Sequence, residues 1–190
     1  KKVVFAEGED ENMLKAAIAF KNSRLGTPIV IGNEKRVKQQ LKDIGLDENY
    51  KIQIVNSTDQ EKREKYTKNL YNKLQRQGLL ERDVDRLIRN DRIIWGSSMV
   101  ESGDADAMVT GNIRHYAASI ESLRKVVEAR KGEILFGLNM LITSKKTVFV
   151  ADTQVNDFPS AENLTKIATS SVRVARLFGF DPKVAFLSHS

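Results

Sequence analysis

The chain has 190 residues, of which 41% are hydrophobic and 29% are charged. This is enough apolar material for a real core, in one large domain or two small ones. The formal net charge is +6, but acids alternate with bases, as in residues 61–65, which is typical of a solvated helix face. The chain contains no cysteine, which excludes disulfides, thiolate metal sites and cysteine nucleophiles.

The composition also bears on membranes and nucleic acids. No apolar run reaches the length of a membrane span, and the apolar residues 3–6 are too few for a signal peptide. We therefore expect a cytoplasmic protein without a membrane partner. The basic excess raises the alternative of a nucleic-acid-binding module, but the chain lacks aromatic stacking platforms and a clustered basic stripe. We therefore expect no nucleic-acid partner.

The first half of the chain alternates short apolar runs with helical patterns. Buried strands are predicted at residues 3–6, 28–32 and 51–55. Between them, apolar residues recur at three-to-four spacing, and Gly26 and Gly45 are placed to end the two helices. Strands and helices that alternate in this way predict an α/β fold with a largely parallel sheet.

Capping residues predict where two further helices begin. Asn33 is expected to cap the helix after the second strand. Ser57 with Gln60 three residues on forms a capping box, which predicts the start of a long charged helix. Two shorter helices are expected between residues 84 and 100.

The remainder of the chain continues the alternation and then changes its pattern. A strand is predicted over residues 105–111 and a helix over residues 117–130, with its apolar side chains inward. Residues 134–150 hold two apolar runs around a polar turn, which predicts a β-hairpin. A helix over residues 161–178 and a strand over residues 184–187 follow.

These elements predict two domains. Residues 1–132 are expected to form most of a three-layer α/β domain with a parallel sheet. Residues 133–190 are expected to begin a second α/β domain that is truncated. Because the chain stops directly after a predicted strand, we expect it to be part of a longer polypeptide.

Several familiar sites are missing from the sequence. No G-x-G-x-x-G or G-x-x-x-x-G-K-[ST] motif is present, so no nucleotide cofactor is expected in this chain. The two histidines, His115 and His189, lie far apart, and there is no cysteine, so no metal site is expected either. The loops at the carboxyl ends of the predicted strands are therefore the candidate ligand sites.

The first candidate loop follows the strand at residues 105–109. Gly111 permits a tight turn, the helix behind it offers N–H groups to an anion, and Arg114 adds a cation. The alternative is an ordinary strand-to-helix turn with a surface arginine. The candidate ligand-binding residues are Thr110, Gly111, Asn112, Arg114 and His115.

The second candidate loop follows the second strand of the predicted hairpin, at residues 151–156. It carries several side chains that form hydrogen bonds, directly after a buried strand. The alternative is a turn with helix-capping residues, which accounts for Asn156, Asp157 and Ser160. The candidate ligand-binding residues are Asp152, Thr153 and Asn156.

The third candidate loop comprises Ser188, His189 and Ser190. A serine beside a histidine suggests a nucleophile and its base. Adjacent residues of a strand point to opposite faces, however, so Ser188 and His189 do not pair easily. We expect the three residues to contact a ligand, and we assign no catalytic residue.

Five segments of the chain carry a family resemblance. They are Val4–Asp10, Gly103–Ala107 before the glycine turn, Ala151–Asn156 (Ala-Asp-Thr-x-Val-Asn), Pro159–Leu164 (Pro-x-Ala-Glu-x-Leu) and Phe178–Ser190, which ends Leu-Ser-His-Ser. Together they resemble the phosphate acetyl/butyryltransferase family over the whole chain. The resemblance implies a phosphotransacetylase or isocitrate-dehydrogenase-like fold of two α/β domains with a cleft between them, in a homodimer or larger homo-oligomer.

The details are most similar to the branch fused to the C-terminal side of bacterial NADP-dependent malic enzymes. Ala151–Asn156 and the final Leu-Ser-His-Ser match that branch. Active transferases tend to carry an Arg-Pro pair where this chain has Glu121 and Ser122, and a basic residue where it has Leu74. A glutamate in place of an arginine reverses the sign of the interaction with a phosphate.

The resemblance implies an acetyl-CoA-responsive regulatory domain that is not catalytic by itself. The parent malic enzyme oxidatively decarboxylates malate to pyruvate, with NADP and Mg²⁺ or Mn²⁺ bound by a catalytic domain elsewhere in the same polypeptide. The partners are then acetyl-CoA or CoA, that catalytic domain and further copies of the chain. The alternative is an active phosphate acetyltransferase, which transfers an acetyl group between CoA and phosphate and whose catalytic residues lie beyond Ser190.

Overall fold

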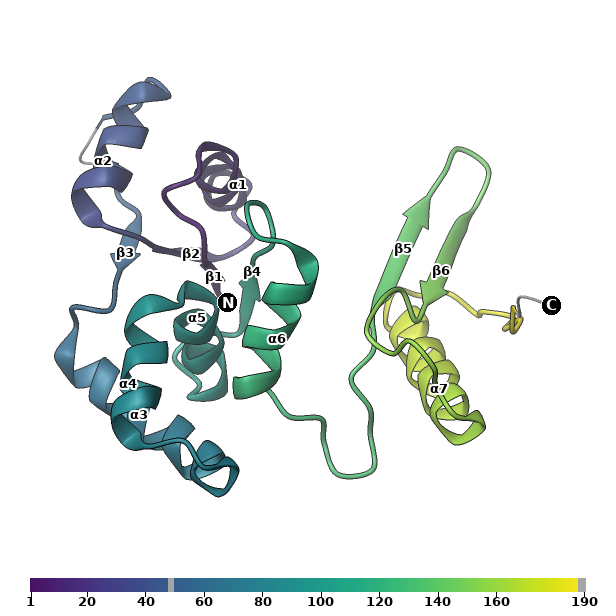
Figure 1. The fold of residues 1–190 in the computed structure, drawn as a ribbon. Helices are drawn as coiled ribbons and strands as arrows, with labels where there is room; N and C mark the ends of the chain where they lie inside the picture. The colour runs from purple at the N-terminus through teal and green to yellow at the C-terminus, as the bar shows by residue number, and fades with distance from the viewer. Residues whose placement is uncertain (48–49, 188–190) are drawn as a thin grey trace. The chain divides into compact units, whose positions relative to one another are not determined.

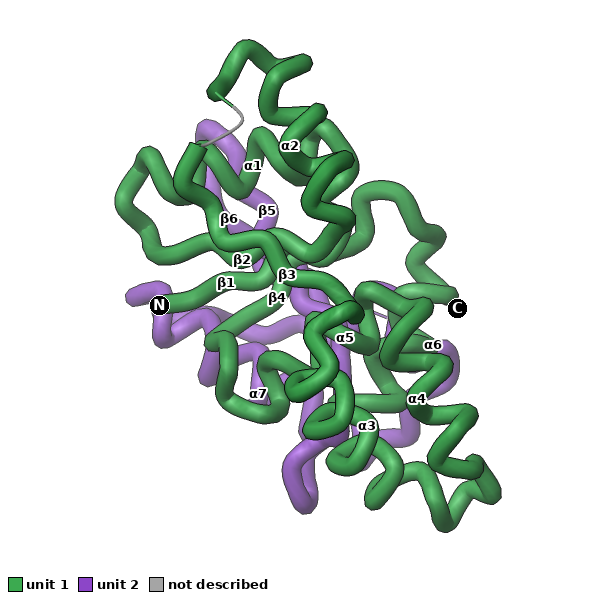
Figure 2. The backbone as a smooth tube through the Cα atoms, turned by 90° about the vertical axis from the view of Figure 1, so that its left-hand side faces the viewer, with its two compact units in different colours: residues 1–127 green, residues 128–190 purple. Residues whose placement is uncertain are grey.

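The computed structural model describes residues 1–47 and 50–187 (Figure 1). The chain forms two compact units, residues 1–127 and residues 128–190 (Figure 2). The predicted α/β class is confirmed, whereas the predicted extent of the two family domains stays a prediction.

Unit 1 is built on a four-stranded parallel sheet in the order β3-β2-β1-β4. The strands are β1 (Lys2–Phe5), β2 (Thr27–Ile31), β3 (Gln53–Val55) and β4 (Ala107–Val109). Val4 in the central strand pairs with Ile29 of β2 and Met108 of β4. All four strands arise where the sequence predicts them, although β3 and β4 are shorter than expected.

Helices cover both faces of this sheet. The helices of unit 1 are α1 (Glu11–Asn22), α2 (Glu34–Asp43), α3 (Gln60–Leu74), a 3-10 turn η1 (Gln75–Gln77), α4 (Glu81–Asn90), α5 (Arg92–Glu101) and α6 (Tyr116–Val126). Alternate side chains of a strand point to opposite faces, so Phe5 packs with α1 and α2 and Val4 packs with α3 to α6. The two clusters fill the space between the sheet and the helices on each of its faces. Helices, sheet and helices make up the predicted three layers.

Helix α5 is the most deeply placed helix of the described chain. Seven of its residues are buried, and the edge of Trp95 meets the ring of Tyr66 in α3 at 5.1 Å between centroids. The Tyr66 hydroxyl donates a hydrogen bond of 2.7 Å to Asp104. Because α5 is fixed in this way, Asp91 and Arg92 at its N-terminus are held at a defined place.

Two helix boundaries differ from the predictions. Asn33 caps α2 as predicted, but Asp59, and not Ser57, caps α3 by accepting from the N–H of Lys62. Asp59 accepts from the N–H three residues further on, which is the spacing expected for Ser57 and Gln60. Ser57 and Asp59 were therefore both possible N-caps of this helix. Helix α1 ends at Asn22, because Ser23 takes the C-cap position before Gly26 is reached.

Helix α6 buries Val126 of its predicted apolar face together with two serines. Ser119, Ser122 and Val126 are its buried residues, while Ile120 and Leu123 are only partly buried. Each of the two serine hydroxyls finds a hydrogen-bond acceptor, which makes their burial tolerable.

Unit 2 consists of a β-hairpin and one long helix. Strands β5 (Leu138–Ile142) and β6 (Thr147–Ala151) pair antiparallel, and α7 (Ala161–Leu177) follows. The predicted hairpin and helix are confirmed. The predicted strand at residues 184–187 does not form among the described residues, since no strand edge pairs with it and Leu187 is 96% exposed.

Candidate functional site

The carboxyl ends of the strands in unit 1 carry a cluster of charged and polar side chains. The loops after β1, β2 and β4 meet there, because parallel strands end at the same edge of a sheet. The N-terminus of α5 adds Asp91 and Arg92 to this cluster. The cluster includes all five residues predicted in the first candidate loop.

Glu7 holds the turn at Gly111 from inside. Its side chain follows β1 directly and is buried, with 3% exposure. The carboxylate accepts hydrogen bonds from the N–H groups of Gly111 (3.1 Å), Asn112 (2.7 Å) and Ile113 (3.3 Å). The donors of the turn itself are therefore occupied by an internal anion.

Arg114 is tied to the start of α5. Its Nη1 atom lies 2.8 Å from Oδ2 of Asp91 and 3.4 Å from the hydroxyl of Ser122. The Ser122 hydroxyl donates to the same Asp91 oxygen at 2.7 Å. Burial acts to raise the pKa of Asp91, but hydrogen bonds from Arg114, Ser122 and the Ile94 N–H hold it below its ordinary value.

Glu9 makes a second set of hydrogen bonds and ion pairs at the same edge of the sheet. Its carboxylate accepts the N–H of Asn33 at 2.8 Å and pairs with Arg92 at 2.6 Å and Arg36 at 3.2 Å. Burial acts to raise the pKa of Glu9, and these three donors outweigh it, so the pKa lies below its ordinary value. Glu9 thus joins the loops after β1 and β2 to α5.

The other residues of the first loop are less constrained. The Thr110 hydroxyl is buried and has no hydrogen-bond partner in the described part of the chain. The Asn112 amide donates to Asp10 at 2.6 Å. His115 is exposed at the N-cap of α6, and its side chain makes no capping hydrogen bond. The first turn of α6 therefore lacks a cap from the histidine side chain.

In unit 2, Asp152 organises the second candidate loop. Its carboxylate accepts the N–H groups of Gly137 (2.7 Å), Val155 (3.3 Å) and Asn156 (2.8 Å). The Asn156 amide donates both to Asp152 at 2.5 Å and to the carbonyl of Leu135 at 2.9 Å. Burial acts to raise the pKa of Asp152, but these hydrogen bonds hold it below its ordinary value.

Two of the predicted residues in this loop thus serve the loop itself. Thr153 lies beside them, half-buried. The cap of α7 is Ser160, whose hydroxyl accepts the N–H of Asn163 at 3.2 Å, as the capping alternative predicts for that residue.

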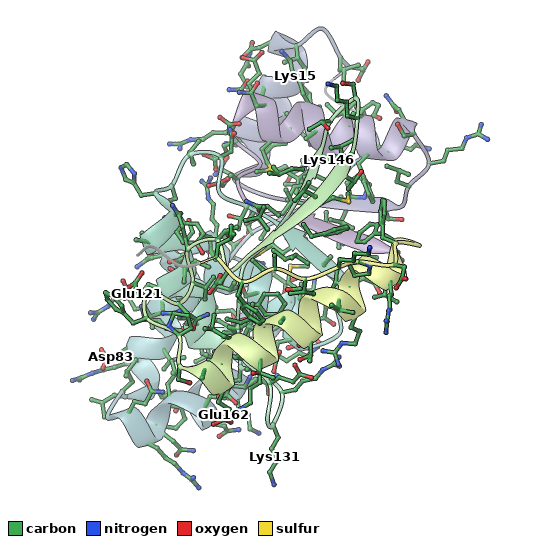
Figure 3. The ribbon with its side chains drawn as sticks, turned by 90° about the vertical axis from the view of Figure 1, so that its right-hand side faces the viewer. Lys15, Asp83, Glu121, Lys131, Lys146 and Glu162 are labelled. Atoms are coloured by element: carbon green, nitrogen blue, oxygen red, sulfur yellow. The ribbon has the colours of Figure 1, made fainter. Side chains whose placement is uncertain are left out.

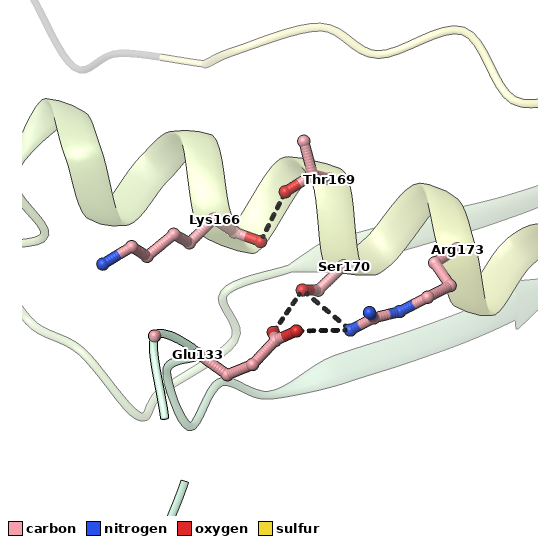
Figure 4. Close-up of a pocket in the computed structure, with 6 residues that line it drawn as sticks. Glu133, Lys166, Thr169, Ser170 and Arg173 are labelled. Carbon is pink, nitrogen blue, oxygen red and sulfur yellow. Dashed lines mark hydrogen bonds and ion pairs between the residues drawn. The ribbon is translucent and has the colours of Figure 1, made fainter. Parts of the chain in front are cut away.

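A shallow pocket of about 200 Å³ also lies in unit 2, along one face of α7 (Figure 4). Its lining residues are Gly132, Glu133, Lys166, Thr169, Ser170 and Arg173. The Glu133 carboxylate accepts from the Ser170 hydroxyl at 3.0 Å and from Arg173 at 3.1 Å. Arg173 and Ser170 together hold the pKa of Glu133 below its ordinary value.

The predicted residues of the first two loops belong to different units. Those of the first loop lie together in unit 1, and those of the second loop lie together in unit 2. Ser188, His189 and Ser190 lie outside the described residues.

Comparison with known proteins identifies the family. The phosphate acetyl/butaryl transferase family matches residues 1–190. The chain belongs to this family. Among curated relatives, it is 41% identical over its whole length to an NADP-dependent malic enzyme of Rhizobium meliloti, of which it covers 25%. It is 33% identical over its whole length to a phosphate acetyltransferase of Nitratidesulfovibrio vulgaris, of which it covers 27%.

Solved structures of this family share the fold. A phosphotransacetylase from Streptococcus pyogenes matches 98% of the chain with a TM-score of 0.88 and 29% identity, and the match covers 57% of that protein. A phosphotransacetylase from Staphylococcus aureus matches 95% of the chain with a TM-score of 0.83 and 26% identity. The chain thus spans little more than half of these structures and about a quarter of the curated relatives named above.

Two positions at which the family resemblance expects cations carry other residues here. Glu121 is exposed on α6 and pairs with Lys125 at 2.7 Å (Figure 3). Leu74 is 3% exposed and belongs to the core of unit 1. A cation does lie near this part of α6, but it comes from the loop after β4. The guanidinium of Arg114 lies beside Ser122, the residue after Glu121.

The sequence analysis missed several members of the cluster in unit 1. They are Glu7, Glu9, Arg36, Asp91 and Arg92. Glu7 and Glu9 directly follow a predicted strand, and that position is the signal that could have singled them out. Asp91 precedes a predicted helix and looks like a simple N-cap, so its pairing with Arg114 carries no sequence signal.

Two further findings concern the described residues alone. Residues 1–47 and 50–187 contain no group of three or more His, Cys, Asp or Glu side chains that could hold a metal ion. None of the helices in that part of the chain is both long enough and apolar enough to span a membrane.

Proposed function

We propose that this chain is an acetyl-CoA-responsive regulatory domain of an NADP-dependent malic enzyme. The observation that carries the proposal is the 41% identity to a malic enzyme over the full length of the chain. The parent enzyme oxidises and decarboxylates malate to pyruvate, with NADP and Mg²⁺ or Mn²⁺ bound by another part of the polypeptide. It works in the cytoplasm as a homodimer or a larger homo-oligomer.

The cluster at the sheet edge of unit 1 supports a role in binding rather than in group transfer. Its turn donors are engaged by Glu7, and three of its arginines are paired with Glu9 or Asp91. Glu121 places a carboxylate on α6 where a transferase of the family is expected to carry a cation. A site of this kind has fewer free positive charges to stabilise a phosphoryl or acetyl group during its transfer.

Acetyl-CoA is proposed as the effector because its diphosphate suits the donors that remain. The first turn of α6 lacks a cap from His115, the buried Thr110 hydroxyl has no partner in the described part of the chain, and Arg114 is partly exposed. Regulation then requires only that acetyl-CoA bind one conformation of the parent enzyme more tightly than another.

The test uses the complete natural polypeptide that contains this chain. We expect acetyl-CoA to bind it and to change the rate of malate-dependent NADP reduction, with free CoA as the matched control. Absence of acetyl-CoA binding contradicts the proposal. CoA-dependent consumption of acetyl phosphate supports the alternative, an active phosphate acetyltransferase, which the 33% identity to such an enzyme favours.

A further inference from the structure

Asp91 serves two purposes with its two carboxylate oxygens. Oδ1 accepts the N–H groups of Ile93 at 2.9 Å and Ile94 at 3.3 Å and so caps α5. Oδ2 accepts Arg114 Nη1 at 2.8 Å and the Ser122 hydroxyl at 2.7 Å. One carboxylate therefore connects the start of α5, the loop after β4 and the middle of α6.

The same contacts fix the guanidinium of Arg114. The Asp91 side chain is 13% exposed and that of Arg114 is 42% exposed, so the pair lies at the boundary between core and solvent. A guanidinium has five N–H donors. In the described part of the chain, the hydrogen bonds of this side chain involve Nη1 alone. Among the described residues, its Nη2 and Nε donors are therefore left for a ligand, on a side chain that is 42% exposed.

We infer that Asp91 and Ser122 are positioning residues that hold Arg114 so that its other N–H groups bind a phosphate of the ligand. This inference rests on the proposed function, because it names the part of acetyl-CoA that the cluster recognises. A guanidinium held in advance loses less side-chain freedom when it binds, and its planar fork suits two phosphate oxygens at once.

The pairing also explains how a cation can be selective. Asp91 neutralises Arg114 at long range, so weakly charged anions gain little from approaching it. A phosphate that reaches the free edge of the guanidinium still forms charge-assisted hydrogen bonds of fixed direction. The recognised group is therefore a phosphate with two oxygens presented together.

A double-mutant cycle on the complete polypeptide tests the positioning role. Asp91→Asn keeps a good helix cap, since asparagine and aspartate cap equally well, but it removes the charge that holds Arg114. We expect Asp91→Asn to weaken acetyl-CoA binding about tenfold when Arg114 is present and by less than about twofold beside Arg114→Met. Equal weakening in both backgrounds overturns the inference, because Asp91 then acts only through the fold.

A second measurement does not depend on the affinity for acetyl-CoA. Phenylglyoxal modifies accessible arginines, and mass spectrometry reports the rate at each position. We expect Arg114 to react several-fold faster in Asp91→Asn and Ser122→Ala than in the unaltered protein. Arg36, with a side chain 75% exposed, serves as the internal control and should react at an unchanged rate. An unchanged rate at Arg114 contradicts the positioning role.

Protection by ligands separates this inference from the proposed function. If acetyl-CoA protects Arg114, both are supported. If inorganic pyrophosphate protects Arg114 and acetyl-CoA neither binds nor protects, the phosphate site stands and the proposed effector is wrong. If acetyl-CoA binds without protecting Arg114, the proposed function stands and the phosphate site is wrong. If neither compound binds or protects, both are overturned.

Discussion

Glu7 shows how a single residue can determine a loop. A buried carboxylate needs hydrogen-bond donors, and three successive backbone N–H groups of the turn at Gly111 supply them. The acid comes from the loop after β1 and the donors come from the loop after β4, some 104 residues away. The two loops therefore support each other.

Replacing Glu7 by glutamine should loosen this turn. The amide has one acceptor oxygen where the carboxylate has two, so at least one N–H loses its partner. We expect the free energy of unfolding of unit 1 to fall by about 1–3 kcal/mol. Urea denaturation followed by the fluorescence of Trp95, the sole tryptophan, measures this change. Hydrogen exchange at Gly111 to Ile113 should also become faster.

A matched variant distinguishes the turn from a general effect of lost charge. Glu121→Gln removes an exposed carboxylate that pairs with Lys125. We expect no measurable change in stability, because exposed ion pairs contribute little. Equal losses in the two variants contradict the assigned role of Glu7.

Asp152 gives unit 2 a predictable dependence on pH. Its pKa in the folded protein lies below the ordinary value of 3.8. The contribution of Asp152 to stability is therefore fully present above pH 3.8 and is lost as the pH falls through the lower folded pKa. In acid, we expect the protection of the Gly137 N–H, measured against its intrinsic exchange rate at the same pH, to fall as Asp152 takes up a proton.

The variant Asp152→Asn tests this dependence. It should show low protection of the Gly137 N–H already at neutral pH and a smaller further loss of protection in acid. Asp157→Asn, an exposed neighbour in the same segment, should retain the behaviour of the unaltered protein. A full acid response in Asp152→Asn places its origin in another group.

At the level of elements, the loop after β4 is the part to which ligand binding is assigned. Gly111 has φ of 101°, and a Cβ atom there meets no other atom within 4 Å. A side chain at this position therefore strains the backbone without a clash. Gly103 matches it, with φ of 75° and equally open surroundings, but it lies before β4.

These two glycines make a controlled pair of substitutions. We expect Gly111→Val and Gly103→Val to destabilise the protein to a similar extent, by roughly 1–3 kcal/mol. Only Gly111→Val should weaken acetyl-CoA binding, as measured by calorimetry. Unchanged affinity in Gly111→Val removes this loop from the candidate site.

The elements that the sequence predicted best are those in which apolar residues recur with a regular period. The buried strands and amphipathic helices of unit 1 follow from local apolar patterns. The strand at residues 184–187 was wrong because its formation depends on a neighbouring edge, which local patterns do not encode. The buried serine face of α6 was missed because its acceptors come in part from Asp91, on another helix.

The candidate site was predictable to a similar degree. The loops at Gly111 and at Asp152 follow from strand ends, and both are built around polar networks in the structure. The acids that occupy their donors could not all be predicted. The place of Glu7 directly after a predicted strand could have indicated it, whereas Asp91 resembles a simple N-cap and meets Arg114 only after the chain has folded.

At the scale of the whole molecule, the two units differ in how much core they hold. Both clusters of buried apolar side chains lie within residues 1–127. Unit 2 instead has a two-stranded sheet and exposes large apolar residues, including Phe158 at 99%. An isolated two-stranded sheet is marginally stable at best in water, and unit 2 contributes no residue to either of the two core clusters.

We therefore expect the two units to behave differently when they are produced separately. Residues 1–127 should unfold cooperatively in urea, with a midpoint similar to that of unit 1 in the intact chain. Residues 128–190 should show helical circular dichroism without a cooperative transition and should bind a hydrophobic dye. A sharp transition in the second fragment contradicts this expectation.

The three-way contact at Asp91 also has an evolutionary consequence. A substitution at Asp91, Arg114 or Ser122 leaves the other two side chains with an unmatched charge or an unpaired hydroxyl. Natural selection should therefore have preserved the three as a set or replaced them as a set. An alignment of the family can show this as correlated variation among positions that lie 23 and 31 residues from Asp91.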